Sequence, residues 1–207
     1  MPKKETPTEL TKRERFEETG RFPVAKTVII GLVVVVIAVG AFVGYRGFTG
    51  TPQVGGPVVD QGGPDYSDGP VAMSILSNAT VEGGNLEIPV AEIQAKKIVG
   101  VLYHRTNPLP AGYDDIDGNG LPVLAYIAPS GRLVVASSLC EPCHSYDFHI
   151  EGMDLVCNAC FTRWDLNTLE GKDGGCKAYP PNELTIAVQG DTVLVSTELL
   201  ESWVPRA

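Results

Sequence analysis

An uncharged run of nineteen residues, Thr27–Tyr45, limits how this chain can fold. At about 1.5 Å per residue, a helix of that length spans about 28 Å, close to the ~30 Å hydrocarbon core of a bilayer. The run has no polar face that a helix on the surface of a soluble domain would turn to water. Lys26 and Arg46 bracket it, and its last residue is a tyrosine, a type enriched at membrane interfaces. We therefore predict one transmembrane helix over residues 27–45.

The flanks of this run predict its orientation. Residues 1–26 carry seven Lys and Arg against five Asp and Glu, whereas residues 46–70 hold one basic residue and three Asp. Basic residues remain on the cytoplasmic side, so residues 1–26 are predicted to be cytoplasmic and the chain beyond the helix extracytoplasmic. A cleaved secretory signal is the alternative. Its apolar region is usually about 7–15 residues behind a short leader, which favours an uncleaved anchor here.

Beyond the helix, composition separates a linker from an acidic domain. Residues 46–70 are rich in Gly and Pro, which predicts an extended linker. Residues 71–207 carry seventeen acidic against eight basic residues, a net charge of −9. An acidic domain lacks the basic face that nucleic-acid binding requires, so we expect no nucleic-acid partner.

Residues 71–207 are predicted to form a small, antiparallel, mostly β domain. Five runs rich in Val, Ile, Leu and Tyr are predicted strands: Lys97–His104, Pro122–Ile127, Arg132–Ser138, Leu184–Val188 and Thr192–Ser196. Turn signals separate such runs at Pro129-Ser130-Gly131, at Glu151-Gly152 and at Gly190-Asp191, and the last pair suits a two-residue hairpin. No long segment in this region has helical periodicity.

All five cysteines follow residue 139, and four of them form two C-x-x-C pairs. The pairs are Cys140 with Cys143 and Cys157 with Cys160, and thirteen residues separate them. Two intervening residues let both thiolates of a pair face one metal. Two pairs together supply four sulfur ligands for zinc, a single iron or an iron–sulfur cluster. Because an extracytoplasmic compartment is oxidising, two disulfides are the alternative.

The first pair also permits a haem interpretation. Cys140–His144 spells C-x-x-C-H, the attachment motif of c-type haem, with His144 as proximal ligand and His149 or Met153 as distal ligand. This interpretation leaves the second pair without a role, whereas a four-thiolate site uses both pairs. We therefore favour the four-thiolate site and keep His144 and His149 as candidate additional ligands or neighbours of it.

A short acidic segment begins like a calcium-binding loop. Asp115, Asp117 and Asn119 offer oxygen atoms at positions 1, 3 and 5, and Gly120 stands at position 6. Position 12 is Tyr126 instead of a bidentate Glu, so weak calcium binding competes with an exposed acidic turn. The sequence contains no G-x-S-x-G, H-E-x-x-H or Gly-rich loop ending in Lys-Ser/Thr, and nothing in it predicts hydrolysis or phosphate chemistry.

The order and spacing of several motifs resemble a known family. They are Pro89-Val90-Ala91-Glu92-Ile93, Gly131-Arg132-Leu133-Val134-Val135-Ala136 leading into Cys140, Glu151-Gly152, Leu155-Val156-Cys157-Asn158 with Cys160, Trp164, Gly174-Gly175-Cys176 and Pro180-Pro181. Over residues 86–196 this pattern resembles the FtrD-like group of bacterial membrane-anchored iron–sulfur proteins, named for a component of an iron-transport system. The resemblance implies an iron–sulfur or iron-handling protein and a fifth functional cysteine. That cysteine, Cys176, is expected as an extra ligand, a nearby thiol or a buried structural residue.

Residues 160–166 with Gly171 also resemble the second ligand loop of Rieske proteins. Cys143 and Cys160 stand where histidine ligands would be expected in that family. Histidine ligation raises a Rieske potential, so four thiolates would lower the potential of any cluster here. The expected fold is therefore one transmembrane helix followed by a Rieske-like or zinc-ribbon-like β domain.

Together these features predict a single-pass membrane protein whose extracytoplasmic domain holds an iron–sulfur centre and passes single electrons. Such a protein is an electron-transfer component rather than an enzyme, and its expected partners are membrane redox proteins or an iron-transport permease. The predicted ligands are Cys140, Cys143, Cys157 and Cys160. A structural zinc module that mediates protein contacts and a c-type haem carrier are the alternatives.

Overall fold

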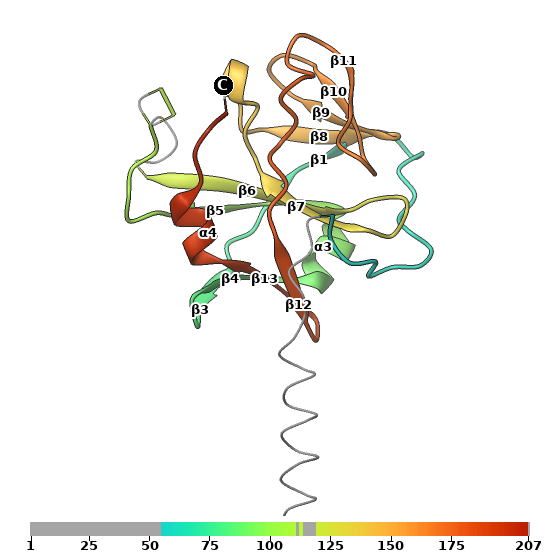
Figure 1. The fold of residues 1–207 in the computed structure, drawn as a ribbon. Helices are drawn as coiled ribbons and strands as arrows, with labels where there is room; N and C mark the ends of the chain where they lie inside the picture. Colours follow the sequence, from blue (N-terminus) through green and yellow to red (C-terminus); the bar gives the residue numbers. More distant parts are fainter. Residues whose placement is uncertain (1–54, 111, 114–118, 207) are drawn as a thin grey trace, which may run out of the picture. The chain divides into compact units, whose positions relative to one another are not determined.

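The computed structural model describes residues 55–110, 112–113 and 119–206. These residues form three β-sheets and two short α-helices (Figure 1). The predicted transmembrane helix at residues 27–45 lies outside this part of the chain, as does the N-terminal segment before it. Within the described ranges, no helix is both long and apolar enough to cross a membrane.

The central sheet contains the longest strands. In spatial order these are β2 (Ser74–Ile75), β5 (Ile98–His104), β6 (Gly120–Ile127) and β7 (Leu133–Ser137). Strands β5, β6 and β7 pair antiparallel and confirm three of the predicted strands. The short β2 pairs parallel with β5, which is the exception to the predicted antiparallel arrangement.

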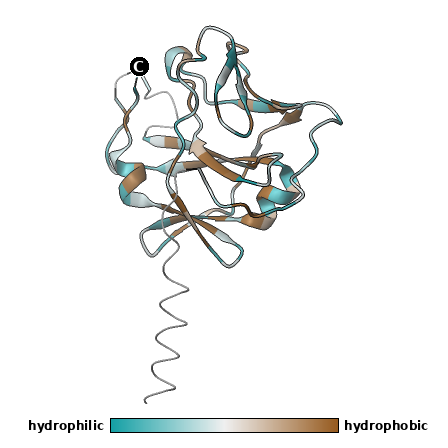
Figure 2. Ribbon diagram, turned by 45° about the vertical axis from the view of Figure 1, so that its right-hand side comes forward, coloured by the Kyte–Doolittle hydropathy of each residue, from teal (hydrophilic) through white to brown (hydrophobic). Residues whose placement is uncertain are grey.

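Both faces of the central sheet are buried. Along β6, Val123 and Ala125 belong to one hydrophobic cluster, while Leu124 and Tyr126 belong to another. Because successive side chains point to opposite faces, a strand covered on both sides is apolar at every position. This explains the continuous apolar runs in the sequence, and Figure 2 shows hydrophobic colouring along strands and hydrophilic colouring in many loops.

The second sheet covers one face of the central sheet (Figure 1). In order, its strands are β12 (Ile186–Gln189), β13 (Thr192–Ser196), β4 (Asn85–Pro89) and β3 (Thr80–Glu82). Strands β12 and β13 confirm the predicted hairpin, since Gln189 pairs with Thr192 and Gly190 has a positive φ of 57°. The helices α3 (Val90–Lys96) and α4 (Thr197–Ser202) follow β4 and β13 and are too short to show periodicity in the sequence.

The third sheet covers the other face and carries the cysteine loops. In order, its strands are β1 (Val71–Ala72), β8 (Phe148–Glu151), β9 (Asp154–Cys157), β10 (Arg163–Asp165) and β11 (Gly171–Asp173). The sequence analysis did not identify these strands, because each has only two to four residues. The described residues thus confirm a small, mostly antiparallel β domain.

Part of the segment with linker-like composition contacts the domain. Tyr66 is buried, and its hydroxyl donates a hydrogen bond of 2.6 Å to the Ile127 carbonyl. The N–H of Val59 donates to the Gly131 carbonyl at 3.0 Å. Gly131 has φ of 80°, and a Cβ there would lie 1.6 Å from the Asp60 carbonyl oxygen, so only glycine permits this close approach.

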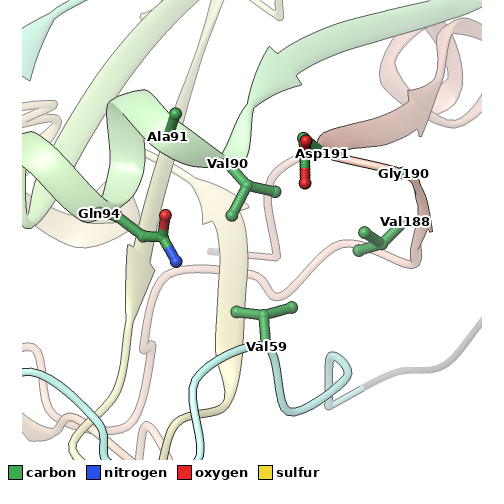
Figure 3. Close-up of a pocket in the computed structure, with 7 residues that line it drawn as sticks. All are labelled: Val59, Val90, Ala91, Gln94, Val188, Gly190 and Asp191. Atoms are coloured by element: carbon green, nitrogen blue, oxygen red, sulfur yellow. The ribbon is translucent and has the colours of Figure 1, made fainter.

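A pocket of about 410 Å³ lies between α3 and the β12–β13 hairpin (Figure 3). Its lining residues are Val59, Val90, Ala91, Gln94, Val188, Gly190 and Asp191. Among these described residues, Asp191 is the only ionisable one and none is a cysteine. The pocket is therefore separate from the cysteine chemistry.

Candidate metal centre

All five cysteines converge beside the central and third sheets. The sulfur atoms of Cys140, Cys143, Cys160 and Cys176 lie within 4.8 Å of one another. The Cys140 and Cys160 sulfurs are 3.7 Å apart, and Cys157 places its sulfur 3.7 Å from that of Cys143. All five are free cysteines, so the two disulfides considered from the sequence are not formed.

The two C-x-x-C loops close with the same backbone hydrogen bond. The N–H of Cys140 donates to the Ser145 carbonyl at 2.7 Å, and the N–H of Cys157 donates to the Thr162 carbonyl at 3.1 Å. In each loop the first cysteine therefore bonds to the residue five positions later. The first loop leads into β8 and the second joins β9 to β10, so the third sheet holds both loops.

Cys176 reaches the site on a third loop, directly after β11. Its N–H donates to the Thr162 hydroxyl at 3.2 Å, and the Trp164 indole N–H donates to the Lys177 carbonyl at 3.3 Å. Gly174 permits this packing because it has φ of 98° and a Cβ there would lie 2.5 Å from the Thr162 hydroxyl oxygen. The resemblance implied a functional Cys176, and the structure brings its sulfur into the cluster.

The cluster is buried on one side and partly open on the other. Cys140, Cys157 and Cys176 are buried in the hydrophobic cluster of the third sheet, whereas Cys143 and Cys160 are partly exposed. The low dielectric of the buried side strengthens interactions between charged groups. The open side brings two of the five sulfurs toward solvent.

The sulfur atoms differ in acidity. The hydrogen bond between Cys140 and Cys157 raises the pKa of Cys140 and lowers that of Cys157 to about 4. Backbone N–H groups of Ala159 and Cys160 add to the lowering of the Cys157 pKa. Burial raises the pKa of Cys143 to about 12. Without a metal, Cys157 is therefore a thiolate near neutral pH, while Cys140 and Cys143 are thiols.

Thr162 is a functional neighbour that the sequence analysis did not identify. Its side chain is buried, and its hydroxyl oxygen lies 3.2 Å from the Cys160 sulfur. Burial acts to raise the pKa of Cys160, but hydrogen bonds from the Thr162 hydroxyl and N–H outweigh burial and lower it. A threonine two positions after the second cysteine of a C-x-x-C pair was the available sequence signal.

We expect metal binding to release protons near neutral pH. Metal ligands must be thiolates, so the two thiols with raised pKa, Cys140 and Cys143, each lose a proton on binding. Calorimetry at pH 7 in buffers of different ionisation enthalpy should find at least two protons released per ion, and affinity should fall by about 100-fold or more per pH unit on acidification. Proton release close to zero would contradict this protonation pattern.

Cysteine donors suit a metal ion bound by four thiolates, and the four sulfurs within 4.8 Å of one another include Cys176 in place of the predicted Cys157. With a metal–sulfur distance of about 2.3 Å, the edge of a tetrahedron of sulfur atoms is about 3.8 Å. The two 3.7 Å sulfur–sulfur distances, Cys140 to Cys160 and Cys143 to Cys157, match that edge. Soft thiolate ligands suit zinc and iron.

A family model covers most of this region. Residues 112–206 match the model described as "Membrane iron-sulfur containing protein FtrD-like". Over these residues the chain is similar to the FtrD-like family. The match confirms the resemblance found in the sequence, although it begins after the motif at Pro89–Ile93. The FtrD-like description joins iron–sulfur chemistry to a membrane location. No curated protein and no solved structure matches this chain.

In this FtrD-like region, His144 packs against an aromatic ring. Its ring stacks on Tyr113 with 4.5 Å between centroids and 29° between planes. His144 has φ of 58° and Phe161 has φ of 56°, so the residue after each C-x-x-C pair adopts the left-handed conformation. The group of candidate ligands among the described residues contains only cysteines. In the C-x-x-C-H motif, Cys140–Cys143 thus form a cysteine loop and His144 is the left-handed residue that follows it.

Replacing His144 by Ala should leave the metal in place. The variant loses one ring stack and keeps a left-handed non-glycine residue, so its free energy of unfolding should change by about 1 kcal/mol or less. Metal analysis and the visible spectrum of the purified variant measure the outcome. Loss of a covalently bound haem would instead support the haem alternative.

His149 lies in a polar network beside the second cysteine loop. Its Nδ1 is hydrogen-bonded to the Asn158 side-chain oxygen, and the Asn158 amide donates to Asp147 at 2.6 Å. Met153, the other suggested distal ligand, exposes 48% of its surface. His149 is thus engaged by Asn158 and Met153 is exposed to solvent, and neither belongs to the group of candidate ligands among the described residues.

The calcium prediction falls largely on residues that the structure leaves undescribed. Asp115 and Asp117 lie outside the described residues, and Asn119 forms the turn before β6. The Asn119 carbonyl accepts a hydrogen bond of 3.1 Å from the Arg105 N–H, which helps close the β5–β6 connection. The calcium site stays a prediction.

A buried ion pair supports the first cysteine loop. Glu141 lies between the first two cysteines and is fully buried, with 0% exposure. The Arg206 side chain donates from Nε to the Glu141 carboxylate at 2.8 Å, and the Arg206 backbone N–H donates to the same carboxylate. The Tyr113 hydroxyl donates to the Glu141 carbonyl at 3.1 Å. No sequence pattern links Glu141 with a residue 65 positions away.

Proposed function

We propose that this chain is a membrane-anchored, extracytoplasmic electron-transfer protein whose cysteine cluster holds an iron–sulfur centre. The observation that carries the proposal is the convergence of five cysteine sulfurs. Those of Cys140, Cys143, Cys160 and Cys176 lie within 4.8 Å of one another, and that of Cys157 lies 3.7 Å from that of Cys143. The edge at Cys143 and Cys160 is partly exposed. Iron held by thiolates exchanges single electrons. The FtrD-like match supports both the iron–sulfur assignment and the membrane location.

In this proposal the protein's residues hold and tune the centre. Cys140, Cys143, Cys157 and Cys160 supply the thiolates, and the hydrogen bonds of Thr162 stabilise charge on Cys160. Hydrogen bonds to the sulfurs and solvent exposure adjust the reduction potential of thiolate-bound iron. The partly exposed sulfurs, Cys143 and Cys160, offer the shortest route for an electron to a partner.

A structural zinc module is the second candidate, because the sulfur spacing fits a single zinc ion. The 3.7 Å distances correspond to the edge of a tetrahedron around a single ion, which zinc satisfies as well as iron does. Zinc has no redox chemistry in proteins, so a zinc-loaded domain would organise protein contacts instead of carrying electrons.

Colour and metal content separate the two candidates. The full-length protein, purified anaerobically in detergent, should be coloured, with visible absorption that bleaches on reduction by dithionite. Metal analysis should find iron, and its ratio to acid-labile sulfide gives the type of centre. A colourless protein with one zinc per chain contradicts electron transfer, and a Soret band that survives denaturation would reveal covalent haem.

Topology and partners form part of the same proposal. Residues 1–26 lie in the cytoplasm, residues 27–45 form the anchor, and the cysteine domain lies outside. Its partners are membrane redox proteins or an iron-transport permease. An epitope tag after Ala207 should bind antibody on spheroplasts, in which the cytoplasmic membrane is intact and the outer layers of the cell envelope are removed. A tag before Met1 should bind only after lysis, and the reverse result contradicts the orientation.

A further inference from the structure

The two chain segments that carry the partly exposed cysteines also carry exposed aromatic residues. Phe161 directly follows Cys160 and exposes 68% of its surface, and Tyr146 lies three residues after Cys143 and exposes 48%. Cys143 and Cys160 are the two partly exposed ligands. The two aromatic residues are therefore close in the chain to the sulfurs nearest solvent.

Phe161 contributes little to folding. Its ring is exposed, and its backbone has φ of 56°, a left-handed conformation that is uncommon for a bulky residue and costs about 1 kcal/mol. Asn or Gly would occupy the same backbone conformation with less strain. The loop explains the backbone conformation but not the choice of a large apolar side chain that is exposed to solvent, and such a side chain suits a surface that binds a partner.

The acidic charge of the domain favours a cationic partner. Residues 71–207 carry a net charge of −9, and Asp147 is exposed directly after Tyr146. A membrane surface rich in anionic lipid would repel such a domain. A cationic protein would be attracted over a distance, and aromatic residues commonly form the energetically important centre of protein interfaces.

We infer that Phe161 and Tyr146 form the docking surface for a cationic redox protein, one whose cofactor edge is apolar and ringed by Lys and Arg. This inference rests on the proposed electron-transfer function. In the docked complex, one electron passes from the reduced centre to the oxidised cofactor of the partner, beside Cys143 and Cys160. No proton moves and no bond forms or breaks.

Two oxidants test the docking surface with full-length protein in detergent. The protein is reduced, freed of reductant and mixed in a stopped-flow instrument with ferric cytochrome c, a cationic haem protein, or with hexaammineruthenium(III), a small cation. Phe161→Asn should slow electron transfer to cytochrome c by about tenfold, because an interface loses a central aromatic contact. Transfer to hexaammineruthenium should stay within about twofold, because a small complex needs no docking surface.

Companion variants separate contact from charge and from folding. Tyr146→Ser should slow cytochrome c in the same way, and Asp147→Asn should weaken the dependence of the rate on salt. Val81→Thr is the matched control, because Val81 exposes 58% of its surface on β3, a strand without cysteines. Visible absorption and thermal unfolding should show that Phe161→Asn is at least as stable as the parent protein.

Each remaining outcome has one meaning. Unchanged cytochrome c rates in both aromatic variants overturn the docking surface while leaving electron transfer intact. If the aromatic variants reduce cytochrome c more slowly only when the protein is in liposomes, the two residues contact the membrane, and the docking surface is overturned. If the reduced parent protein transfers electrons to neither oxidant, the proposed function itself is overturned.

Discussion

Replacing Cys157 by Ala should empty the metal centre and unfold the domain, whereas replacing Cys176 by Ala should leave the metal bound. The Cys176 sulfur is one of the four that lie within 4.8 Å of one another, and the Cys157 sulfur lies 3.7 Å from that of Cys143. Backbone N–H groups of Ala159 and Cys160 stabilise the Cys157 thiolate. Structural zinc bound by Cys and His ligands is worth about 10–16 kcal/mol in small domains, which exceeds the total stability of many domains. Cys140→Ala, Cys143→Ala and Cys160→Ala should behave like Cys157→Ala.

Metal content and thermal unfolding measure this ranking. The Cys157→Ala protein should hold almost no metal and show no cooperative transition. Cys176→Ala should keep a full complement and unfold within a few degrees of the parent, since about 1 kcal/mol shifts a domain of this size by about 2–4 °C. If Cys176→Ala empties the site and Cys157→Ala does not, the ligands are Cys140, Cys143, Cys160 and Cys176.

Replacing Arg206 by Met should destabilise the domain by about 2–3 kcal/mol, or about 6 °C in melting temperature. Glu141 is fully buried, and without the guanidinium its carboxylate keeps only part of its hydrogen bonding. Breaking a buried ion pair from one side costs about 3–5 kcal/mol, and we reduce that value because Arg206 is 39% exposed and its backbone N–H still donates. Urea unfolding of the metal-loaded protein measures the loss.

The double variant provides the control. In Arg206→Met with Glu141→Gln, no charge is stranded inside the domain, so about half of the lost stability should return. Arg206→Lys should lie between the parent and Arg206→Met, because lysine keeps the charge without the fork of donors. If the double variant is less stable than Arg206→Met alone, the carboxylate is stable without its partner and the ion pair has no role in holding the first loop.

Local patterns in the sequence predicted a substantial part of the domain. Strands β5, β6, β7, β12 and β13 were found from runs of β-branched and apolar residues, and the hairpin between the last two from Gly190-Asp191. The short strands β8 to β11 were missed, because runs of three or four residues cannot display periodicity, although the turn between β8 and β9 was marked by Glu151-Gly152. The prediction of a transmembrane helix rests on the length and apolar character of residues 27–45 and on the residues that flank them.

The candidate site divides in the same way. Both C-x-x-C pairs are sequence-local, so their spacing alone predicted that four thiolates would meet around one metal. The sequence motif that suggested haem could not show that His144 would stack on Tyr113, because the two residues meet only after the chain folds. Thr162 carried a local signal next to Cys160, but its contact with Cys176 required the loop after β11 to fold back.

The sequence by itself determined the acidic charge of the domain, the two C-x-x-C motifs and the apolar strands of the central sheet. Each of these depends on composition or on neighbours a few residues apart. Only the tertiary structure decided that Cys176 joins the other sulfurs and that Arg206 neutralises Glu141 from 65 positions away. Contacts of this kind form only when the sheets pack against one another. A buried charge needs a partner that is near in space, and the spacing of residues along the chain does not show which residue that is.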